Sequence, residues 1–260
     1  MIYKAVWYIA TLQDIRKWFK EGRTKEWMRK EIVLLTLNRL SNMTDAILLD
    51  IEETDVPIDS VEYFLTDCPK SVRKEISPIY KANRKGNRLT KWVKLVRKEV
   101  LAMNFAAVDP QWEADDLIKD RAVEIGDDGY IICSIDKDLH QIHGIHFDYY
   151  RPTAKDENGK PLLDHNGDKV KNPCRGLSYI TETEANRFFW KQMLTGDATD
   201  NIKGLKGVGP KRAEKFIIEA ENSLEDMVKG KYIDHFGEDE GIAQFEMHKV
   251  LIGLGIDHRP

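Results

Sequence analysis

The sequence predicts an α/β protein with a helical region on its C-terminal side. Three observations indicate this: a helical apolar stripe between residues 37 and 51, short β-prone runs that end beside acidic residues, and one glycine-rich stretch. That stretch, Gly196–Lys215 (GDATDNIKGLKGVGPKRAEK), carries two carboxylates, then glycines, then a basic helix start. The chain has no internal repeat, low-complexity tract or clear linker, which favours one compact α/β unit with the helical region packed on it.

Composition is typical of a soluble globular protein. Hydrophobic residues make up 42% of the 260 residues, which is enough for a sizeable core. No stretch approaches the roughly 18 consecutive apolar residues of a membrane span, and the N-terminus lacks the layout of a signal peptide. The three widely spaced cysteines fit reduced thiols better than disulfides or a zinc site. We therefore expect a cytoplasmic protein without a membrane partner.

Two helices are expected first, one over residues 1–20 and one from about Lys25 to Thr54. Apolar residues spaced three or four apart form a stripe along the second helix: Leu37, Leu40, Met43, Ile47 and Ile51. Ala46–Asp50 (AILLD) has an alternative interpretation as a buried strand that ends in a carboxylate.

Short β-prone runs then deliver acidic residues at their ends. Val61–Leu65 precedes Asp67, whose alternative role is that of a turn residue. Tyr130–Ser134 precedes Asp136 and Asp138, and their i, i+2 spacing places both on one side of an extended segment. Because ligands bind at the carboxyl ends of strands in α/β sheets, these acids are candidate metal ligands.

A third run, Asn104–Val108, leads to a helix that Glu113, Asp115 and Asp116 open. Carboxylates at a helix N-terminus can simply be partners of the helix dipole. Three of them in four residues repel one another unless a cation holds them, which favours metal ligands or ligands of metal-bound water.

Phe147–Ser178 predicts a hairpin excursion, because the turn signals DENGK and DHNGD separate β-prone pieces. Asp164 and Asp168 lack the remaining spacing and the closing Glu of a calcium loop, so we interpret them as turn residues.

Charge is divided along the chain, although the net charge is only −4. Residues 70–98 hold eleven Lys or Arg against one acid, and residues 113–138 hold nine acids against three bases. A solvated helix face is the usual meaning of a charge run. Here the basic block has no internal ion pairing to offset its repulsion, so an external polyanion is the better explanation. A basic block beside an acidic block is the pattern of a metal-dependent nuclease.

The glycine-rich stretch combines features of a cation site and a phosphate site. Asp197 and Asp200 lie three residues apart, so one helical turn or one tight loop can point both at the same cation. The glycines that follow let the backbone approach a phosphate, and Pro210 suits the first turn of a helix whose N-terminus attracts it. The alternative is an ordinary helix-turn-helix with a solvated acidic loop.

Four motifs in order resemble the 5′-nuclease family, the flap endonucleases and 5′→3′ exonucleases of phages, bacteria and eukaryotes. They are Tyr80–Arg84 (YKANR), Glu113–Asp116 (EADD), Ser134–Leu139 (SIDKDL) and Gly196–Lys215, which resembles the family's helix-three-turn-helix. The resemblance covers roughly residues 61–218 and is greatest to the phage branch, which includes RNase H-like primer-removing enzymes. A phage-encoded protein would act in the host cytoplasm.

The resemblance implies a PIN-like 5′-nuclease fold, in which helices flank a central, mostly parallel sheet. It also implies a helical arch at about residues 70–112 within an α/β nuclease core over residues 1–180. A helical DNA-binding region with the helix-three-turn-helix module would then cover residues 181–260.

Oxygen ligands without His or Cys select Mg²⁺ or Mn²⁺ over zinc. Eight carboxylates cannot share a site uncompensated, since each pair at 4 Å costs about 4 kcal/mol at an effective dielectric near 20. Two divalent ions, roughly 4 Å apart, would resolve this repulsion. The candidate ligands are Asp67, Glu113, Asp115, Asp116 and Asp136, which the resemblance assigns to the first ion, and Asp138, Asp197 and Asp200, which with Asp136 would hold the second.

In the family, the basic region forms an arch through which a single-stranded 5′ end passes. Lys81 and Arg84 match its phosphate-gripping residues, and Tyr80 is a candidate for stacking on a base. The candidate catalytic residues are Lys81, Arg84, Asp115 and Asp136. The candidate DNA-binding residues are Arg73, Tyr80, Lys81, Arg84, Lys85, Gly204, Gly207, Gly209, Lys211 and Arg212.

The resemblance implies a monomeric phosphodiesterase that acts on DNA with 5′ flaps, nicks or ends. RNA/DNA hybrids are a further candidate substrate, and replication proteins are candidate partners. One alternative is a module that binds branched DNA without cutting it. A ribonuclease of the related PIN type is disfavoured, because those enzymes lack the duplex-binding turn seen in Gly204–Lys211.

Family members begin with a strand that ends in an aspartate and is followed by a helix, and MIYKAVWYIA resembles that helix alone. Asp50 replaces the aspartate only if AILLD is a strand, yet 17 residues to Asp67 leave too little room for the family's intervening helices. We therefore expect one direct metal ligand and a central strand to be missing. This would weaken cleavage more than the binding of branched DNA.

Overall fold

The computed structural model describes residues 17–18, 20–52, 57–83, 90–103, 106–126, 129–220 and 223–255. The helix expected over residues 1–20 lies almost wholly outside them, as do Arg84 and Lys85. The chain divides into two compact units, Met1–Leu65 with Lys85–Ala107 and Thr66–Arg84 with Val108–Pro260. The domain boundary expected near residue 180 stays a prediction.

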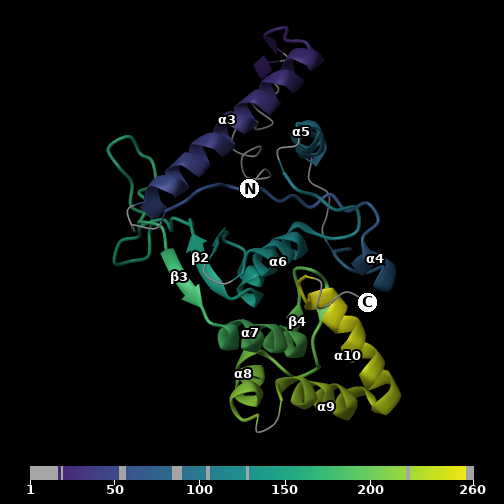
Figure 1. The fold of residues 1–260 in the computed structure, drawn as a ribbon. Helices are drawn as coiled ribbons and strands as arrows, with labels where there is room; N and C mark the ends of the chain where they lie inside the picture. Colours follow the sequence, from purple (N-terminus) through teal and green to yellow (C-terminus); the bar gives the residue numbers. More distant parts are fainter. Residues whose placement is uncertain are drawn as a thin grey trace. The chain divides into compact units, whose positions relative to one another are not determined.

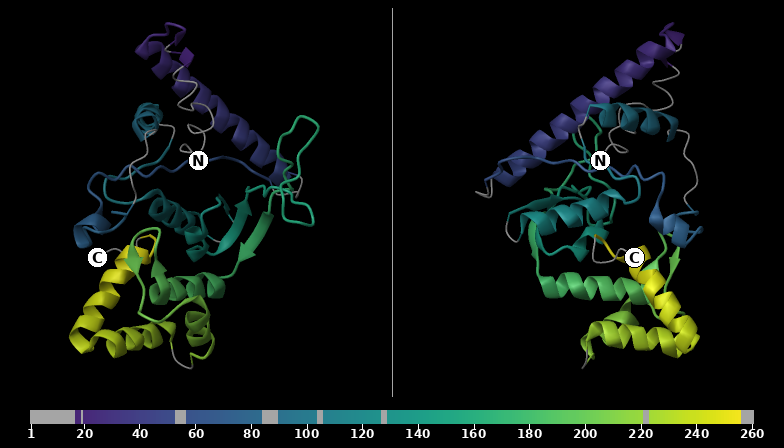
Figure 2. Two further views of the ribbon diagram at one scale, coloured as in Figure 1. Left: turned by 180° about the vertical axis from the view of Figure 1, so that it is seen from behind. Right: turned by 45° about the vertical axis from the view of Figure 1, so that its right-hand side comes forward.

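The first unit is built on α3 (Lys25–Glu52), which lies against α5 (Thr90–Ala102) (Figure 2). Met28 and Ile32 of α3 have no exposed surface and pack with Val96 of α5. The helix expected from Lys25 is therefore confirmed. The strand alternative for residues 46–50 is wrong, because these residues continue the helix.

By length and composition alone, α3 is apolar enough to cross a membrane, and 22% of its most apolar window is buried. The core helices of soluble proteins share this property, so it is weak evidence for a membrane span. The absence of a membrane partner stays a prediction.

The runs expected as strands at residues 61–65 and 104–108 form one parallel bridge in the part of the chain that the structure describes, between Phe64 and Ala107. Leu65 N–H donates to Ala107 O at 3.0 Å, and Ala107 N–H donates to Tyr63 O at 2.8 Å. The two runs are therefore neighbours, and among the described residues they pair only at this bridge, since Asn104 and Phe105 lie outside them.

The second unit holds a three-stranded sheet of β1 (Ile131–Cys133), β2 (Gly144–Asp148) and β3 (Gly176–Ile180), in that order. β1 and β2 run parallel, whereas β2 and β3 run antiparallel. The sheet is thus small and mixed rather than mostly parallel. The reason is the excursion between β2 and β3, which returns the chain as a hairpin instead of through a crossover helix.

This excursion contains two further turns and projects beyond the ends of β2 and β3 (Figure 2). Asp164 Oδ1 accepts hydrogen bonds from the N–H groups of Asn166 and Asp168, both at 2.9 Å, and Asp156 does the same in the other turn. The turn role expected for Asp164 is therefore confirmed.

Besides a pair of two-residue strands, the second unit holds several helices, and the four nearest its C-terminal end gather beside one another (Figure 1). Their core contains aromatic residues from three helices: Trp190, Tyr232 and Phe245. The helical elements are α4 (Val72–Ile76), α6 (Ala114–Ile125), η1 (Lys137–Gln141), α7 (Glu182–Thr195), α8 (Pro210–Ile218), α9 (Leu224–Phe236) and α10 (Glu238–Ile252). The three cysteines are free thiols, as expected.

Candidate active site

The acidic start of α6 is organised by a capping box. Glu113 is the N-cap residue and exchanges hydrogen bonds with Asp116, whose Oδ2 accepts from Glu113 N–H at 3.0 Å. Asp116 has no exposed surface, and Arg73 donates to both of its carboxylate oxygens at 2.6 and 2.7 Å. In this structure Asp116 therefore pairs with Arg73 and caps α6, and its expected role as a metal ligand stays a prediction.

Arg73 is equally buried, with 3% of its surface exposed. Besides Asp116, it donates to the carbonyl oxygens of Val250 at 3.1 Å and Gly253 at 2.7 Å, at the end of α10. Burial alone would lower its pKa, but the hydrogen bonds and charge of Asp116 raise it, so the guanidinium stays charged. All of these bonds use the donors that a phosphate would need, so the DNA-binding role expected for Arg73 would require it to give up these partners, and this role stays a prediction.

Tyr80 and Lys81 belong to a short turn, the Lys81 loop (residues 79–83). Lys81 Nζ donates to both oxygens of Glu113, at 2.7 and 2.6 Å, and lies 3.4 Å from Asp200 Oδ2. Tyr80 Oη donates to Glu113 at 2.8 Å and to Asp200 at 3.1 Å. Burial raises the pKa of Glu113, but the charge and hydrogen bonds of Lys81, the charge of Arg73 and the hydrogen bond from Tyr80 together outweigh it and lower the pKa overall.

Tyr80 is 3% exposed and packs in the core beneath the site. Burial, and next the charge of Glu113, raise its pKa, so the hydroxyl stays protonated and acts as a donor. Because the ring is covered, it offers no face to a base. The stacking role expected for Tyr80 is therefore not compatible with this position.

Asp197 and Asp200 lie on one tight loop, the Asp200 loop (residues 197–201), between the two-residue strands β4 (Gly196–Asp197) and β5 (Ile202–Lys203). Asp197 Oδ1 accepts from Thr199 N–H at 2.7 Å, and Asp197 is 7% exposed. Of the two geometries that the spacing allowed, the loop is the one observed.

Asp136 and Asp138 do not lie on an extended segment as expected. Asp136 is the N-cap of the short helix η1 and accepts from Asp138 N–H at 3.1 Å, which places Asp138 in the first helical turn. Gln192 of α7 donates to Asp138 Oδ1 at 2.6 Å, and Gln141 donates to Gln192 Oε1 at 2.8 Å. Gln141 also donates to Ile252 O at 2.9 Å, so a buried amide chain fixes Asp138.

These segments meet at one small cavity of about 30 Å³, which is space for one or two water-sized groups. Burial, and next the charges of Asp136 and Glu113, raise the pKa of Asp115 to about 7. Asp67 is exposed and does not line the cavity, although the neighbouring Thr66 accepts a hydrogen bond from Ala114 N–H at 3.0 Å. The carboxylates that line the cavity are Glu113, Asp115, Asp138, Asp197 and Asp200.

Within the described residues, no three carboxylate, imidazole or thiol side chains are close enough together to hold one ion. The donor chemistry nevertheless fits a divalent cation. Every acidic side chain on the cavity offers oxygen, and burial, with the neighbouring charges of Asp136 and Glu113 as the next cause, raises the pKa of Asp115. Lys81 is a cation that already bridges Glu113 and Asp200.

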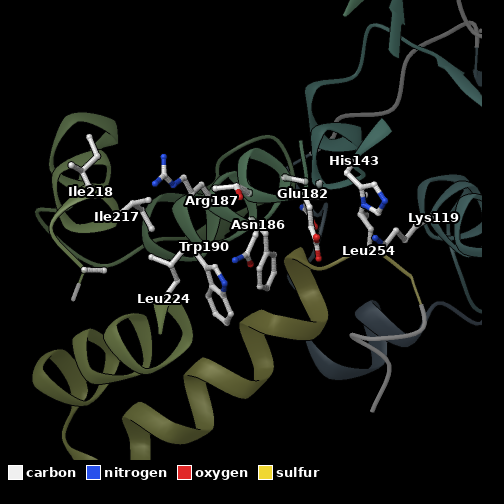
Figure 3. A pocket seen from close by; sticks show the side chains of 15 residues that line it. Lys119, His143, Glu182, Asn186, Arg187, Trp190, Ile217, Ile218, Leu224 and Leu254 are labelled. Atoms are coloured by element: carbon white, nitrogen blue, oxygen red, sulfur yellow. The ribbon is translucent and has the colours of Figure 1, made fainter. Parts of the chain in front are cut away.

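A larger hollow of about 580 Å³ lies along α7 (Figure 3). Ile217, Ile218 and Leu224 lie toward one end of it, and Lys119 and His143 lie toward the other. Glu182 is the single carboxylate among its lining residues. Size alone would favour this hollow, but the convergent acids and the perturbed pKa favour the small cavity as the reactive site.

With the geometry established, the chain can be compared with known proteins. It matches the family of the 5′-3′ exonuclease N-terminal resolvase-like domain over residues 30–167, which is more than half of its length. The chain belongs to the 5′-3′ exonuclease family. The match includes Lys81, Glu113, Asp115, Asp136 and Asp138, whereas the Asp200 loop lies beyond it.

Relatives of this 5′-3′ exonuclease family member occur in bacteria. DNA polymerase I of Rhizobium leguminosarum is 28% identical over 188 residues, which are 68% of this chain and 17% of that protein. Flap endonuclease Xni of a Shewanella species is 27% identical over 151 residues, which are 56% of this chain and 52% of that protein. The chain thus spans about half or less of the length of these relatives.

The fold of this family member resembles that of a T5 protein that was co-crystallized with metal ions. The TM-score is 0.52 at 17% sequence identity, and the similarity covers 85% of this chain and 80% of that one. At this identity the likeness concerns the fold alone, an α/β arrangement of helices around a small mixed sheet.

Sequence reasoning missed the polar residues that hold the acids in place. Gln192 lies on the buried face of α7, three residues after Phe189, where an apolar residue is the usual choice. Asn83 and Asn201 each bond to a carbonyl oxygen of a distant loop. The signal for Gln192 was a polar residue on an apolar stripe, and the signal for Asn201 was an Asn in a turn, where left-handed backbone is tolerated.

Proposed function

We propose that the chain is a divalent-metal-dependent 5′ nuclease that hydrolyses phosphodiester bonds near the 5′ ends of branched or nicked DNA. One observation carries this proposal: five carboxylates from three separate segments line one small cavity, with the ammonium group of Lys81 among them. The membership of the 5′-3′ exonuclease family supports it. Flaps, nicks and RNA primers at 5′ ends are the substrates to test.

The carboxylates on the cavity would hold Mg²⁺ or Mn²⁺, and we propose two ions because the acids form two groups. Asp115 and Glu113 come from α6, with Asp136 near them, while Asp138, Asp197 and Asp200 come from η1 and the Asp200 loop. When bound, such ions supply an activated water and stabilise the leaving oxygen. Asp67 is a candidate metal ligand only because it follows Thr66, whose side chain accepts a hydrogen bond from Ala114 at the start of α6.

The chain's own residues would bind and orient the substrate. Lys81 holds Glu113 at the cavity by donating to its carboxylate oxygens. A scissile phosphate also offers anionic oxygen acceptors, so the ammonium group can bind it in place of the carboxylate. Tyr80 keeps Glu113 and Asp200 in place as a donor. Gln192 orients Asp138. Arg84 and Lys85, which lie outside the described residues, stay candidates for gripping the 5′ strand.

Duplex DNA would bind at the start of α8, which would belong to a helix-three-turn-helix module. Gly209 is the N-cap of α8, Pro210 is its first residue, and a side chain added at Gly209 would meet no atom within 4 Å. The open backbone and the exposed Lys211 and Arg212 therefore suit a phosphate. Gly207 has a φ of 78°, a left-handed conformation that glycine adopts freely.

The test measures cleavage of end-labelled flap and nicked DNA with Mg²⁺ and with chelator. Asp115→Asn and Asp136→Asn should abolish cleavage and leave the fold intact, because each removes one ligand and also one like charge. Asp168→Asn, in an exposed turn of the excursion, is the matched control and should cleave normally. Full Mg²⁺-dependent activity in Asp115→Asn would contradict the site. Tight flap binding by the parent chain without any cleavage would favour the binding-module alternative.

A further inference from the structure

Two loops from distant parts of the chain are tied together beside the acidic cavity. Lys81 N–H donates to Asp200 O at 2.9 Å. The side-chain amide of Asn201 donates to Ile79 O at 2.8 Å, and that of Asn83 donates to Ala198 O at 2.9 Å. The Lys81 loop and the Asp200 loop thus exchange three hydrogen bonds that all end on backbone carbonyl oxygens, independently of the ion pair between Lys81 and Asp200.

Each of the two loops also contains one residue in a left-handed backbone conformation, which side chains other than glycine adopt rarely. Lys81 has a φ of 56° and Asn201 a φ of 61°, and these are the two residues other than glycine with positive φ in the described chain. A left-handed conformation is uncommon for a lysine, which has no short polar side chain to compensate for it. Such a conformation persists only where the surrounding structure holds it, and the bond from Lys81 N–H to Asp200 O does so here.

We propose that Asn83 and Asn201 are positioning residues that clamp the two loops together and thereby hold the Lys81 ammonium at the acidic cavity. The two amides act in opposite directions across the pair of loops, since Asn83 reaches from the Lys81 loop and Asn201 reaches from the Asp200 loop. Each fixes a backbone segment next to a charged side chain, and neither is among the residues that line the cavity. The clamp sets where Lys81 stands relative to Asp200.

This inference rests on the proposed function for the importance of Lys81, but the clamp itself can be measured without DNA or metal. Hydrogen exchange at Lys81 N–H, followed by NMR, reports directly on the bond to Asp200 O. Asn83→Ala and Asn201→Gly should each accelerate this exchange at least tenfold, while exchange within α9 and α10 stays unchanged. Asn201→Gly is the variant that keeps the fold most safely, because glycine adopts positive φ without strain.

The second measurement compares single-turnover cleavage with flap affinity. Both variants should lower the cleavage rate at least tenfold and change the dissociation constant for flap DNA less than twofold. Asn83→Asp keeps the size of the side chain but removes the donor, so it should be at least as impaired as Asn83→Ala. Asn186→Ala, an exposed asparagine of α7 beside the larger hollow, is the matched control and should behave as the parent chain.

Unchanged exchange at Lys81 in both variants would overturn the clamp, as would normal cleavage by Asn83→Asp. A parent chain that cleaves no 5′-ended DNA would instead contradict the proposed function, and the exchange measurement alone would then decide whether the clamp exists.

Discussion

Arg73 and Asp116 carry opposite charges where almost no solvent reaches them, with side chains 3% and 0% exposed. Removing one partner of such a pair leaves a buried charge without compensation, which costs about 3–5 kcal/mol. We predict that Arg73→Met lowers the free energy of unfolding by about this amount. Urea denaturation measures it.

The double variant Arg73→Met with Asp116→Asn is the control for this prediction. The two oxygens of Asp116 accept from the backbone N–H groups of Glu113 and Gly255, and asparagine keeps only one of these acceptors. Because asparagine carries no charge, the double variant should still be more stable than Arg73→Met alone. Equal stability of the two would contradict the ion-pair explanation. If the Arg73→Met variant bound DNA more weakly under conditions where the variant is folded, the result would support a direct contact between Arg73 and DNA.

Gln192 contributes a single amide hydrogen bond to the acidic cavity, yet this bond fixes Asp138. We predict that Gln192→Leu lowers single-turnover cleavage at least tenfold, about 1.4 kcal/mol of barrier, because Asp138 loses its orienting donor. Stability should fall by only about 1 kcal/mol, the usual net contribution of a hydrogen bond. Gln244→Leu, which removes an exposed amide on α10, is the control and should leave the rate unchanged. An unaltered rate in Gln192→Leu would contradict the orienting role.

At this scale, the sequence predicted the acids better than it predicted their partners. Glu113, Asp115, Asp138, Asp197 and Asp200 meet at one cavity, as the motifs indicated. Charge counts along the chain could not show that Arg73 and Lys81 neutralise acids of α6, because the pairs join residues 32 to 43 positions apart. Such pairing depends on the tertiary fold, and it gives two cations of the basic block partners in the acidic block.

Two glycines of the β4–β5 turn are fixed by close packing. A Cβ at Gly204 would lie 2.2 Å from the carbonyl carbon of Thr195, and one at Gly196 would lie 2.3 Å from Gly204 N. Gly204→Ala should therefore push β4 and β5 apart and destabilise the fold by about 3 kcal/mol or more, because backbone atoms cannot move aside as flexible side chains do. Thermal unfolding measures the change.

Gly209→Ala is the matched comparison, because an added Cβ meets nothing within 4 Å and φ is −87°. It should change stability by at most about 1 kcal/mol, because the smaller entropy of the unfolded chain and the poorer N-cap act in opposite directions. Equal destabilisation by both substitutions would show that packing does not distinguish these glycines.

The start of α8 makes a separate prediction about duplex DNA. Lys211→Ala should weaken binding about equally for all sequences and lower the salt slope by about one, because one phosphate contact is lost. Lys160→Ala, in an exposed turn of the excursion, removes the same charge elsewhere and should leave the slope unchanged. Titration of fluorescent duplex at several salt concentrations measures both variants. An unchanged slope in Lys211→Ala would exclude this residue from the interface.

Elements with strong local signals agreed with the structure, and elements that depend on distant partners did not. The apolar stripe between residues 37 and 51 predicted α3. In place of the strand predicted at residues 61–65 the structure has one bridge, and the sheet is mixed where a mostly parallel one was predicted. Strand pairing depends on segments far away in sequence, which local patterns do not show. The helix η1 replaced an extended segment, since Asp136 caps it locally.

Across the second unit, His248 makes folding sensitive to acid. Its ring is 7% exposed and its Nδ1 lies 2.7 Å from Tyr232 Oη, and burial lowers its pKa to about 4. An unfolded chain has a histidine pKa near 6.5. As the pH falls, the unfolded chain therefore binds the proton before the folded chain does. The contribution of neutral His248 to the free energy of unfolding is complete above about pH 6.5 and is lost as the pH drops toward 4. The loss should reach about 3 kcal/mol, and His248→Gln should make unfolding free energy flatter over this range in urea titrations. Identical slopes for both proteins would contradict this role.

The tie between Asp116 and Gly255 joins residues 139 positions apart in sequence. At about 5–20 residues per second, a ribosome needs on the order of ten seconds to make the chain between them. Throughout that interval the start of α6 lacks both Gly255 and the carbonyl oxygens that hold Arg73. Translation itself thus sets the order of events: the acids are made early, but the centre they form is assembled only after α10 has emerged. A half-made chain would therefore hold Glu113, Asp115 and Asp116 before the contacts that fix them exist.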